Sequence, residues 1–175
     1  MADTLAMIEA TLAHLEQALP DLAVELFPQR PAEYRLNHPV GAVLLGYPGS
    51  VHKAPRALGM VAQERKVRFG CTLVARQVWG SLGAVALLDS LRQALVGWAP
   101  PDCEAITALD DKFLTEEAGV WWYASDFEAQ SLTLEDREPD SGPRLIHTTL
   151  LDDYTTRTEI ILHPEGEITT EHFEP

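Results

Sequence analysis

The sequence predicts an α+β fold, in which an antiparallel β-sheet carries two helices packed on one face, followed by a C-terminal β extension. Two segments have apolar residues at helical spacing, while several others are short and apolar, or alternating, between turn-forming residues. Strands that are adjacent in sequence and tightly connected favour antiparallel pairing. At 175 residues the chain is long enough for one domain with a real core and an appendage.

The first element is an amphipathic helix at the N-terminus. Asp3 or Thr4 is a suitable N-cap, and Pro20 follows its end. The apolar positions recur at alternating three- and four-residue steps, as expected for one helix face: Leu5, Ile8, Leu12, Leu15 and Leu19. The next segment, DLAVELFP at 21–28, is interpreted as a short strand.

Two longer strands are predicted next. PVGAVLLGY at 39–47 is short, apolar and bounded by turn formers, as in a buried strand. A loop follows at Pro55–Gly59. ERKVRFGCTLVARQVW at 64–79 alternates, with Val67, Phe69, Cys71, Leu73 and Ala75 on one face and Arg68, Thr72, Val74 and Arg76 on the other. This pattern is typical of a long strand with one face on a core.

A second helix is predicted from Ser81, as N-cap, to about Trp98, where the sequence APP stops it. Its apolar stripe consists of Ala84, Leu88, Leu91, Leu95 and Trp98. Strands near 105–115 and 120–131 follow, joined by a turn at EEAG, 116–119.

The sequence predicts a main domain at 1–134, a charged Pro/Gly linker at 135–144 and a C-terminal β extension with an acidic tail at 145–175. The extension contains two expected strands, at 145–151 and 156–163. Because about 30 residues bury little core by themselves, we expect this extension to pair with the main sheet or with another molecule.

Composition and charge exclude several classes of protein. No apolar run reaches the roughly 20 residues of a membrane-spanning helix, and the N-terminus lacks the basic start of a secretion signal. Cys71 and Cys103 lie in unrelated contexts, so we expect no disulfide framework and synthesis in the cytoplasm. A net charge of −14 argues against direct contact with nucleic acid.

The charge is also unevenly distributed. Residues 30–92 hold nine basic and three acidic residues, whereas the rest of the chain holds four basic and 24 acidic residues. A chain with a basic middle and acidic ends is suited to binding a copy of itself.

Two motifs resemble catalytic or nucleotide-binding loops only superficially. GYPGSVHK has His52 where a phosphate loop needs glycine before its lysine. Around Ser81, VWGSLGA lacks the first glycine of a nucleophile elbow. We therefore interpret RLNHPVGAVLLGYPGS at 35–50 as a buried strand between two turns, in which Ser50 is not a nucleophile.

No metal-ligand spacing is evident in the sequence. The histidines show neither an H-x3-H pattern nor pairing with cysteine: His14, His38, His52, His147, His163 and His172. Neighbouring acidic residues, such as Asp152–Asp153, are more often solvated turns than cation sites in so acidic a chain. On a strand, VWWY at 120–123 puts Trp121 and Tyr123 on one face and Trp122 on the other, so one side is expected to expose aromatic surface to a protein partner.

Three segments in fixed order resemble the small proteins of Mu-like prophages that are encoded just ahead of the tail sheath. They are HPVGAVLLGYPGS at 38–50, LLDSLRQALVGWAPPDC at 87–103 and DKFLTEEAGVWWYASDFEA at 111–129. The resemblance covers about Leu5 to Leu134 and departs from the family pattern after Glu135. That family is similar in size and element order to phage tail terminators.

The resemblance implies a structural protein of a virion, made in the host cytoplasm, with neither catalysis nor cofactor. Tail terminators assemble as hexameric rings on the head-proximal end of the tail tube, stop its polymerisation and offer a surface to the head connector. The partners implied are further copies of the chain, tail tube and sheath proteins and head connector proteins, with no membrane and no direct nucleic acid. The alternatives are a head–tail joining or minor tail protein and, from another class, a small cytoplasmic metal-dependent enzyme.

A ring of identical subunits requires two different surfaces that meet, and charge suggests which ones. The expected basic surface consists of Arg65, Lys66, Arg68 and Arg76. The expected acidic surface consists of Asp110, Asp111, Glu116 and Glu117. Either Trp121 or Trp122 would supply an apolar anchor. The alternative is that the basic residues are only the solvated side of a strand.

Overall fold

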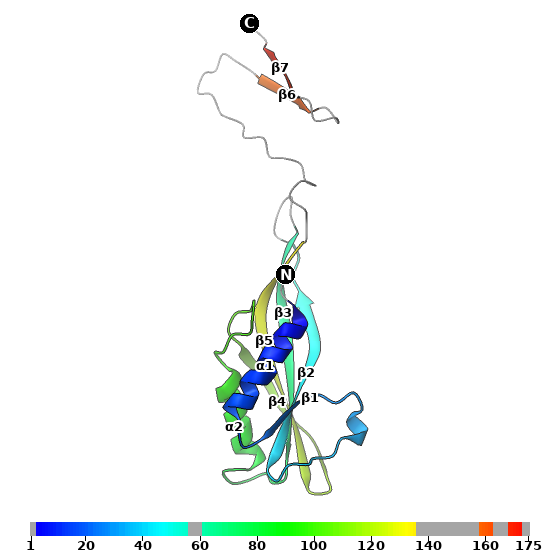
Figure 1. The fold of residues 1–175 in the computed structure, drawn as a ribbon, viewed down its shortest axis with the longest axis vertical. Helices are drawn as coiled ribbons and strands as arrows, with labels where there is room; N and C mark the ends of the chain where they lie inside the picture. The colour runs from blue at the N-terminus through cyan, green and yellow to red at the C-terminus, as the bar shows by residue number, and fades with distance from the viewer. Residues whose placement is uncertain (1–2, 56–60, 136–157, 163–167, 173–175) are drawn as a thin grey trace. The chain divides into compact units, whose positions relative to one another are not determined.

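In a computed structural model of the chain, the described residues are 3–55, 61–135, 158–162 and 168–172. The chain divides into two compact units, Met1–Glu138 and Pro139–Pro175. The first unit contains α1 (Thr4–Ala18), β1 (Ala23–Leu26), the 3-10 turn η1 (Pro31–Glu33), β2 (Gly41–His52), β3 (Ala62–Ala75), α2 (Ala84–Leu95), β4 (Thr107–Glu117) and β5 (Val120–Leu134). Figure 1 shows these elements, and they confirm the predicted α+β class.

The second unit contains one described hairpin, formed by β6 (Thr158–Leu162) and β7 (Ile168–His172). The strand predicted at 156–163 includes β6. The segment predicted as an acidic tail contains β7, so that part of it is strand instead. The strand predicted at 145–151 and most of the predicted linker at 135–144 lie outside the described residues.

The five strands of the first unit form one sheet in the order β1-β2-β3-β5-β4. Four of them pair antiparallel, as expected, but β1 runs parallel to β2, so the sheet is mixed. Parallel neighbours must start at the same end of the sheet. The connection over residues 27–40 is long enough to return the chain to the end of the sheet at which β1 starts, so β2 can run parallel to β1. Strand β3 ends at Ala75, and residues 76–83, predicted in part as strand, form a loop.

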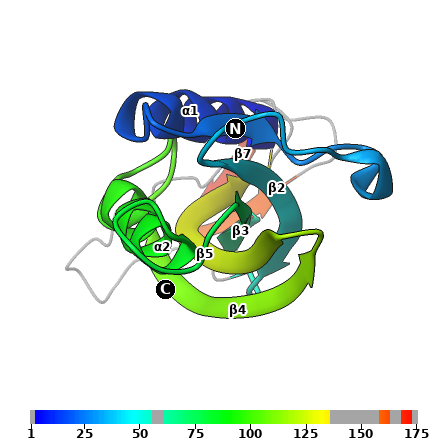
Figure 2. The ribbon, with the colours of Figure 1, turned by 90° about the horizontal axis from the view of Figure 1, so that it is seen from below.

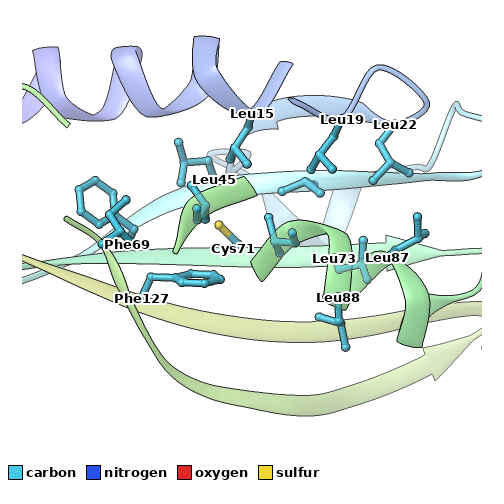
Figure 3. Packing of buried hydrophobic residues seen from close by; sticks show 14 of the residues in the cluster. Leu15, Leu19, Leu22, Leu45, Phe69, Cys71, Leu73, Leu87, Leu88 and Phe127 are labelled. Carbon is cyan, nitrogen blue, oxygen red and sulfur yellow. The ribbon is translucent and has the colours of Figure 1, made fainter. Parts of the chain in front are cut away.

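Both helices pack on the same face of the sheet, as the sequence predicts. The core joins α1, α2 and the inward positions of β2, β3 and β5. Figure 2 shows the curved sheet with the two helices on its concave side, and Figure 3 shows how the buried hydrophobic side chains of this core pack together. The alternation of β3 is confirmed: Val67, Phe69, Cys71, Leu73 and Ala75 are all buried beneath the helices.

The helix ends differ from prediction at α2 but not at α1. The Asp3 carboxylate caps α1 by accepting a hydrogen bond from the Leu5 amide at 2.9 Å. Helix α2, in contrast, has Gly83 as its N-cap, so the prediction for Ser81 is wrong. The backbone carbonyls of Gln77 and Val78 accept hydrogen bonds from the first amides of α2 instead, at 2.8 and 3.3 Å.

Helix α2 also ends at Leu95 rather than near Trp98, because Gly97 adopts a φ of +90° and turns the chain away. Trp98 stacks on His14 of α1, with ring centroids 4.3 Å apart. The Nε2 of His14 also lies 2.8 Å from the Ala94 carbonyl. These contacts join the two helices to each other.

The sheet face opposite the helices, here called the open face, is partly covered by the segment before β2. Leu44 and Val74 point to this face and are fully buried. Arg76 holds the segment in place, because its guanidinium donates hydrogen bonds to the carbonyls of His38 and Leu36 at 2.8 and 3.1 Å. The remainder of the open face carries polar and charged side chains of β3 and β5, together with the exposed Leu132 and Leu134 of β5.

Candidate interaction surfaces

Arg65 is separated from the other residues of the predicted basic surface. It is only 8% exposed and points toward α1, on the opposite side of β3 from Arg68. Its guanidinium donates hydrogen bonds to Thr4 Oγ1 at 2.7 Å, Ser50 Oγ at 2.9 Å and the Tyr47 hydroxyl at 3.2 Å. Arg65 therefore joins α1 to β2, and the expectation that it belongs to an exposed basic surface is corrected.

These hydroxyls form one small network. The Tyr47 hydroxyl oxygen lies 2.8 Å from Ser50 Oγ, and the two groups share a hydrogen bond. The hydrogen bond from Ser50, followed by the interactions with Arg65, lowers the pKa of the Tyr47 phenol despite its partial burial. Ser50 is thus engaged with an arginine and a tyrosine, in a network that ties β2 to Arg65 of β3.

The other three basic residues lie on the open face, but their environments differ. Lys66 pairs with Glu128 of β5 at 2.6 Å. Arg76 is occupied by the two backbone carbonyls described above. Arg68 is exposed, and within the described part of the chain it makes no hydrogen bond or ion pair. Of the four predicted cations, Arg68 is therefore the one available to a partner.

The four predicted acids are also divided. Asp111 binds Arg92 of α2 and the Ser125 hydroxyl, so it fastens β4 to the core. Glu116 accepts a hydrogen bond from the Gly119 amide at 2.7 Å and supports the tight β4–β5 turn, which the sequence predicts correctly. Asp110, Glu116 and Glu117 are exposed, and they leave negative charge along the edge strand.

An open aromatic cleft of about 550 Å³ lies between the β4–β5 hairpin and the loop before α2. Trp121 lies in this cleft, with its ring centroid 5.9 Å from that of Phe113. The lining residues are Val78, Trp79, Val85, Phe113, Trp121 and Tyr123. Trp79 is 78% exposed, and sequence reasoning missed it because it extends an alternating strand pattern.

Trp122 points to the other face, as predicted. It is half-buried and makes an edge-on contact with Tyr34, with ring centroids 5.8 Å apart. Between the two candidate anchors, Trp121 therefore borders exposed aromatic surface, whereas Trp122 helps to hold the segment that covers the open face.

Strand β4 is the free edge of the sheet beside this cleft. It carries exposed Leu109, Phe113 and Leu114. Its register against β5 shifts at Leu109 and again at Leu114. Such bulges are typical of edge strands that avoid indiscriminate pairing. The edge is thus apolar and acidic, but irregular.

A second hollow, of about 280 Å³, lies on the open face around Gly46 and Gly70. Phe27 and Pro48 form part of its wall, and Thr72, Ala124 and Asp126 line the strands beside it. Gly70 has little room for a side chain, because a Cβ would lie 2.9 Å from Pro48 Cγ. The hollow therefore has a floor of backbone, apolar walls and one carboxylate, and we call it the open-face groove.

The cysteines have no features of reactive thiols. Burial raises the pKa of Cys71 to about 12 and also raises that of Cys103. Within the described residues, no group of three or more histidine, cysteine or acidic side chains is arranged to hold a metal ion. Neither described helix has the length and apolarity needed to cross a membrane.

Comparisons with known proteins identify one family. The family model described as Gp37 protein matches residues 11–152. No protein of curated function matches the sequence. A solved structure titled "Virion of native gene transfer agent (GTA) particle" contains a chain 15% identical to this one, with a TM-score of 0.49. The match covers 73% of this chain and 96% of that chain, a likeness too low to carry an argument about function.

Proposed function

The chain belongs to the Gp37 protein family, and we propose that it is a structural protein of a phage or phage-derived virion, acting as the tail terminator. Several copies would form a ring, expected to be a hexamer, on the head-proximal end of the tail tube. The ring would stop addition of tube subunits and present a different surface to the head connector. The chain would act by assembly rather than by catalysis, in contact with tube and sheath proteins.

The observation that carries this proposal is the resemblance of three segments to the Mu-like prophage proteins encoded ahead of the tail sheath. All three lie within the residues matched by the Gp37 family, 11–152. They correspond to β2, to α2 with the turn after it, and to the β4–β5 hairpin. The resemblance therefore covers core elements in order rather than a single short motif.

The surfaces of the first unit support assembly. A closed ring joins two different patches of each subunit, and this unit has several unlike exposed patches. The β4 edge is apolar and acidic, while Arg68 on the open face is exposed and is not paired with any of the described residues. We propose that the acidic side, with Asp110, Glu116 and Glu117, faces the Arg68 side of the next subunit.

Particles assembled without this chain test the proposal. Deleting its gene from the parent element should give tails of uncontrolled length that carry no heads, as seen by electron microscopy. Restoring the gene should restore tails of uniform length. Tails of normal length without heads would indicate a head–tail joining protein instead, and normal particles would contradict a role in the virion.

A further inference from the structure

Trp79 is presented to solvent by a loop of defined geometry. Gly83 makes this loop possible, because a Cβ there would lie 2.4 Å from the Val78 carbonyl oxygen and 2.6 Å from the Trp79 carbonyl carbon. The hydrogen bonds from Ala84 and Val85 to the carbonyls of residues 77 and 78 fasten the loop to α2. Trp79 is thus an exposed apolar side chain on a well-defined loop between the end of β3 and the start of α2. Figure 1 shows where this connection between β3 and α2 lies.

The open-face groove has the chemistry to receive an indole ring. Its walls are largely apolar, and its volume of about 280 Å³ is suited to one large side chain. A buried tryptophan also needs an acceptor for its N–H group, and the exposed Asp126 carboxylate lies in the groove. Trp79 lies beyond the end of β3, whereas Gly70 is in the middle of that strand, so the two features occupy separate regions.

The distribution of charge favours the open-face groove, rather than the other large hollow of the described chain, as the site that receives Trp79. The acidic side chains of Glu116 and Glu117 lie in the hairpin that forms one wall of the aromatic cleft containing Trp79. Arg68 is two residues from Gly70 on the same face of β3, or about 7 Å along the strand. The alternative hollow, of about 500 Å³, is lined by Asp102 and Glu104, which would oppose like charges, and by Glu64, which is paired with Lys53.

We propose that Trp79 of one copy inserts into the open-face groove of a second copy, with Glu116 and Glu117 of the first facing Arg68 of the second. The contact is head-to-tail, because each copy uses its projection on one side and its groove on another. Its place in a closed ring rests on the function proposed above, while the contact between two copies does not. A large, rigid aromatic side chain in a desolvated pocket is the usual form of an interface anchor.

Two variants of the full chain test this contact by sedimentation. Trp79→Ala removes the projection and leaves the groove, whereas Ala124→Phe fills the groove and leaves the projection. Each variant alone should associate at least about tenfold more weakly than the wild type. Mixed together, they should form a dimer and nothing larger, because one intact projection then meets one intact groove.

Controls separate this contact from misfolding and from general stickiness. Leu132→Ala removes an exposed leucine from another part of the sheet, where it is 56% exposed, and should associate like the wild type. Each variant should retain the wild-type circular dichroism spectrum. Arg68→Glu should weaken association, with a smaller effect at high salt.

Three results would overturn the proposal. The first is that Trp79→Ala associates as strongly as the wild type, and the second is that the mixture of the two variants forms no dimer. The third is that the wild-type chain stays monomeric at about 1 mM, a concentration at which a contact with a binding free energy of about −4 kcal/mol would be half formed. Failure of the virion role is a separate result. Deletion of the gene would then leave tails and heads normal, whatever the purified chain does in the centrifuge.

Discussion

Arg65 shows how one residue can be assigned to the wrong environment from its charge alone. Its position in β3 matches that of Val67 and Phe69, so alternation by itself puts it on the core side. A buried guanidinium is stable there only because three hydroxyl groups accept its hydrogen bonds. Two of those hydroxyls lie 15 and 61 residues away in sequence, so no local pattern reveals them.

We predict that Arg65→Lys lowers the free energy of unfolding by about 1–3 kcal/mol. A lysine ammonium lacks the planar fork that reaches Thr4, Ser50 and Tyr47 together, so the buried charge at this position would keep fewer hydrogen-bond partners. Arg68→Lys is the matched control on the same strand and should change stability by less than about 0.5 kcal/mol. Equal effects of the two substitutions in urea denaturation would contradict the structural role of Arg65.

The candidate site was only partly predictable at this scale. The alternation of β5 correctly separates Trp121 from Trp122, because successive side chains of a strand point to opposite faces. The same rule does not apply to Trp79, where the apparent strand pattern continues past Ala75 into a loop. Asp111 was grouped with exposed acids, since its partner Arg92 lies on a helix whose position relative to β4 is set by tertiary packing.

At the scale of elements, the sequence identifies α1, the β4–β5 hairpin and the faces of β3 because each has a strong local period or turn. It does not identify the parallel direction of β1. That direction depends on the path of residues 27–40, which have neither helical nor strand periodicity. The start of α2 was misplaced for a related reason, since backbone carbonyls rather than a serine satisfy its first amides.

The loop before α2 can be tested with two small substitutions. We predict that Gly83→Ala lowers the free energy of unfolding by about 1–3 kcal/mol, because the new methyl group collides with the Val78 and Trp79 carbonyls. Ser81→Ala should be nearly neutral, within about 0.5 kcal/mol. If Ser81 were the N-cap, its replacement would instead cost about 1 kcal/mol. Thermal denaturation of both variants distinguishes the two arrangements.

The packing of α2 on the sheet gives a further prediction. Leu91 is fully buried in the cluster that includes Phe69 and Leu73, so Leu91→Ala should cost about 2–5 kcal/mol. Val85, on the same helix, is 43% exposed and supplies the control, since part of the surface that Val85→Ala removes is already solvated and the loss of stability should be smaller. A melting temperature for Leu91→Ala close to that of the wild type would contradict this orientation of α2.

For the whole molecule, net charge and its distribution limit the ways in which copies can meet. Pairing between two β4 edges is unfavourable, because each carries Asp110, Glu116 and Glu117 against the positive charge of Lys112, while Asp111 is already paired with Arg92. The acidic edge must therefore meet a neutral or basic surface. Among the residues of the predicted basic surface, Arg68 is the one that is available for this purpose in the described part of the chain, since Arg65, Lys66 and Arg76 are engaged within their own subunit.

This restriction leads to a charge-exchange prediction for assembly. Arg68→Glu should reduce association of the full chain at moderate salt without unfolding it, because Arg68 makes no hydrogen bond or ion pair with the described residues. Glu117→Lys should have a similar effect from the other side of the contact. Mixing the two variants should restore part of the association, since the reversed charges again face an opposite sign where the two variants meet.

Arg76→Glu and Asp111→Lys are unsuitable for this purpose, because each breaks contacts inside the subunit. Sedimentation at low and high salt measures the association of the mixture. The part of the association that mixing restores should decrease at high salt, because salt screens the charge pair. A mixture that associates no more strongly than either variant alone would exclude this pairing.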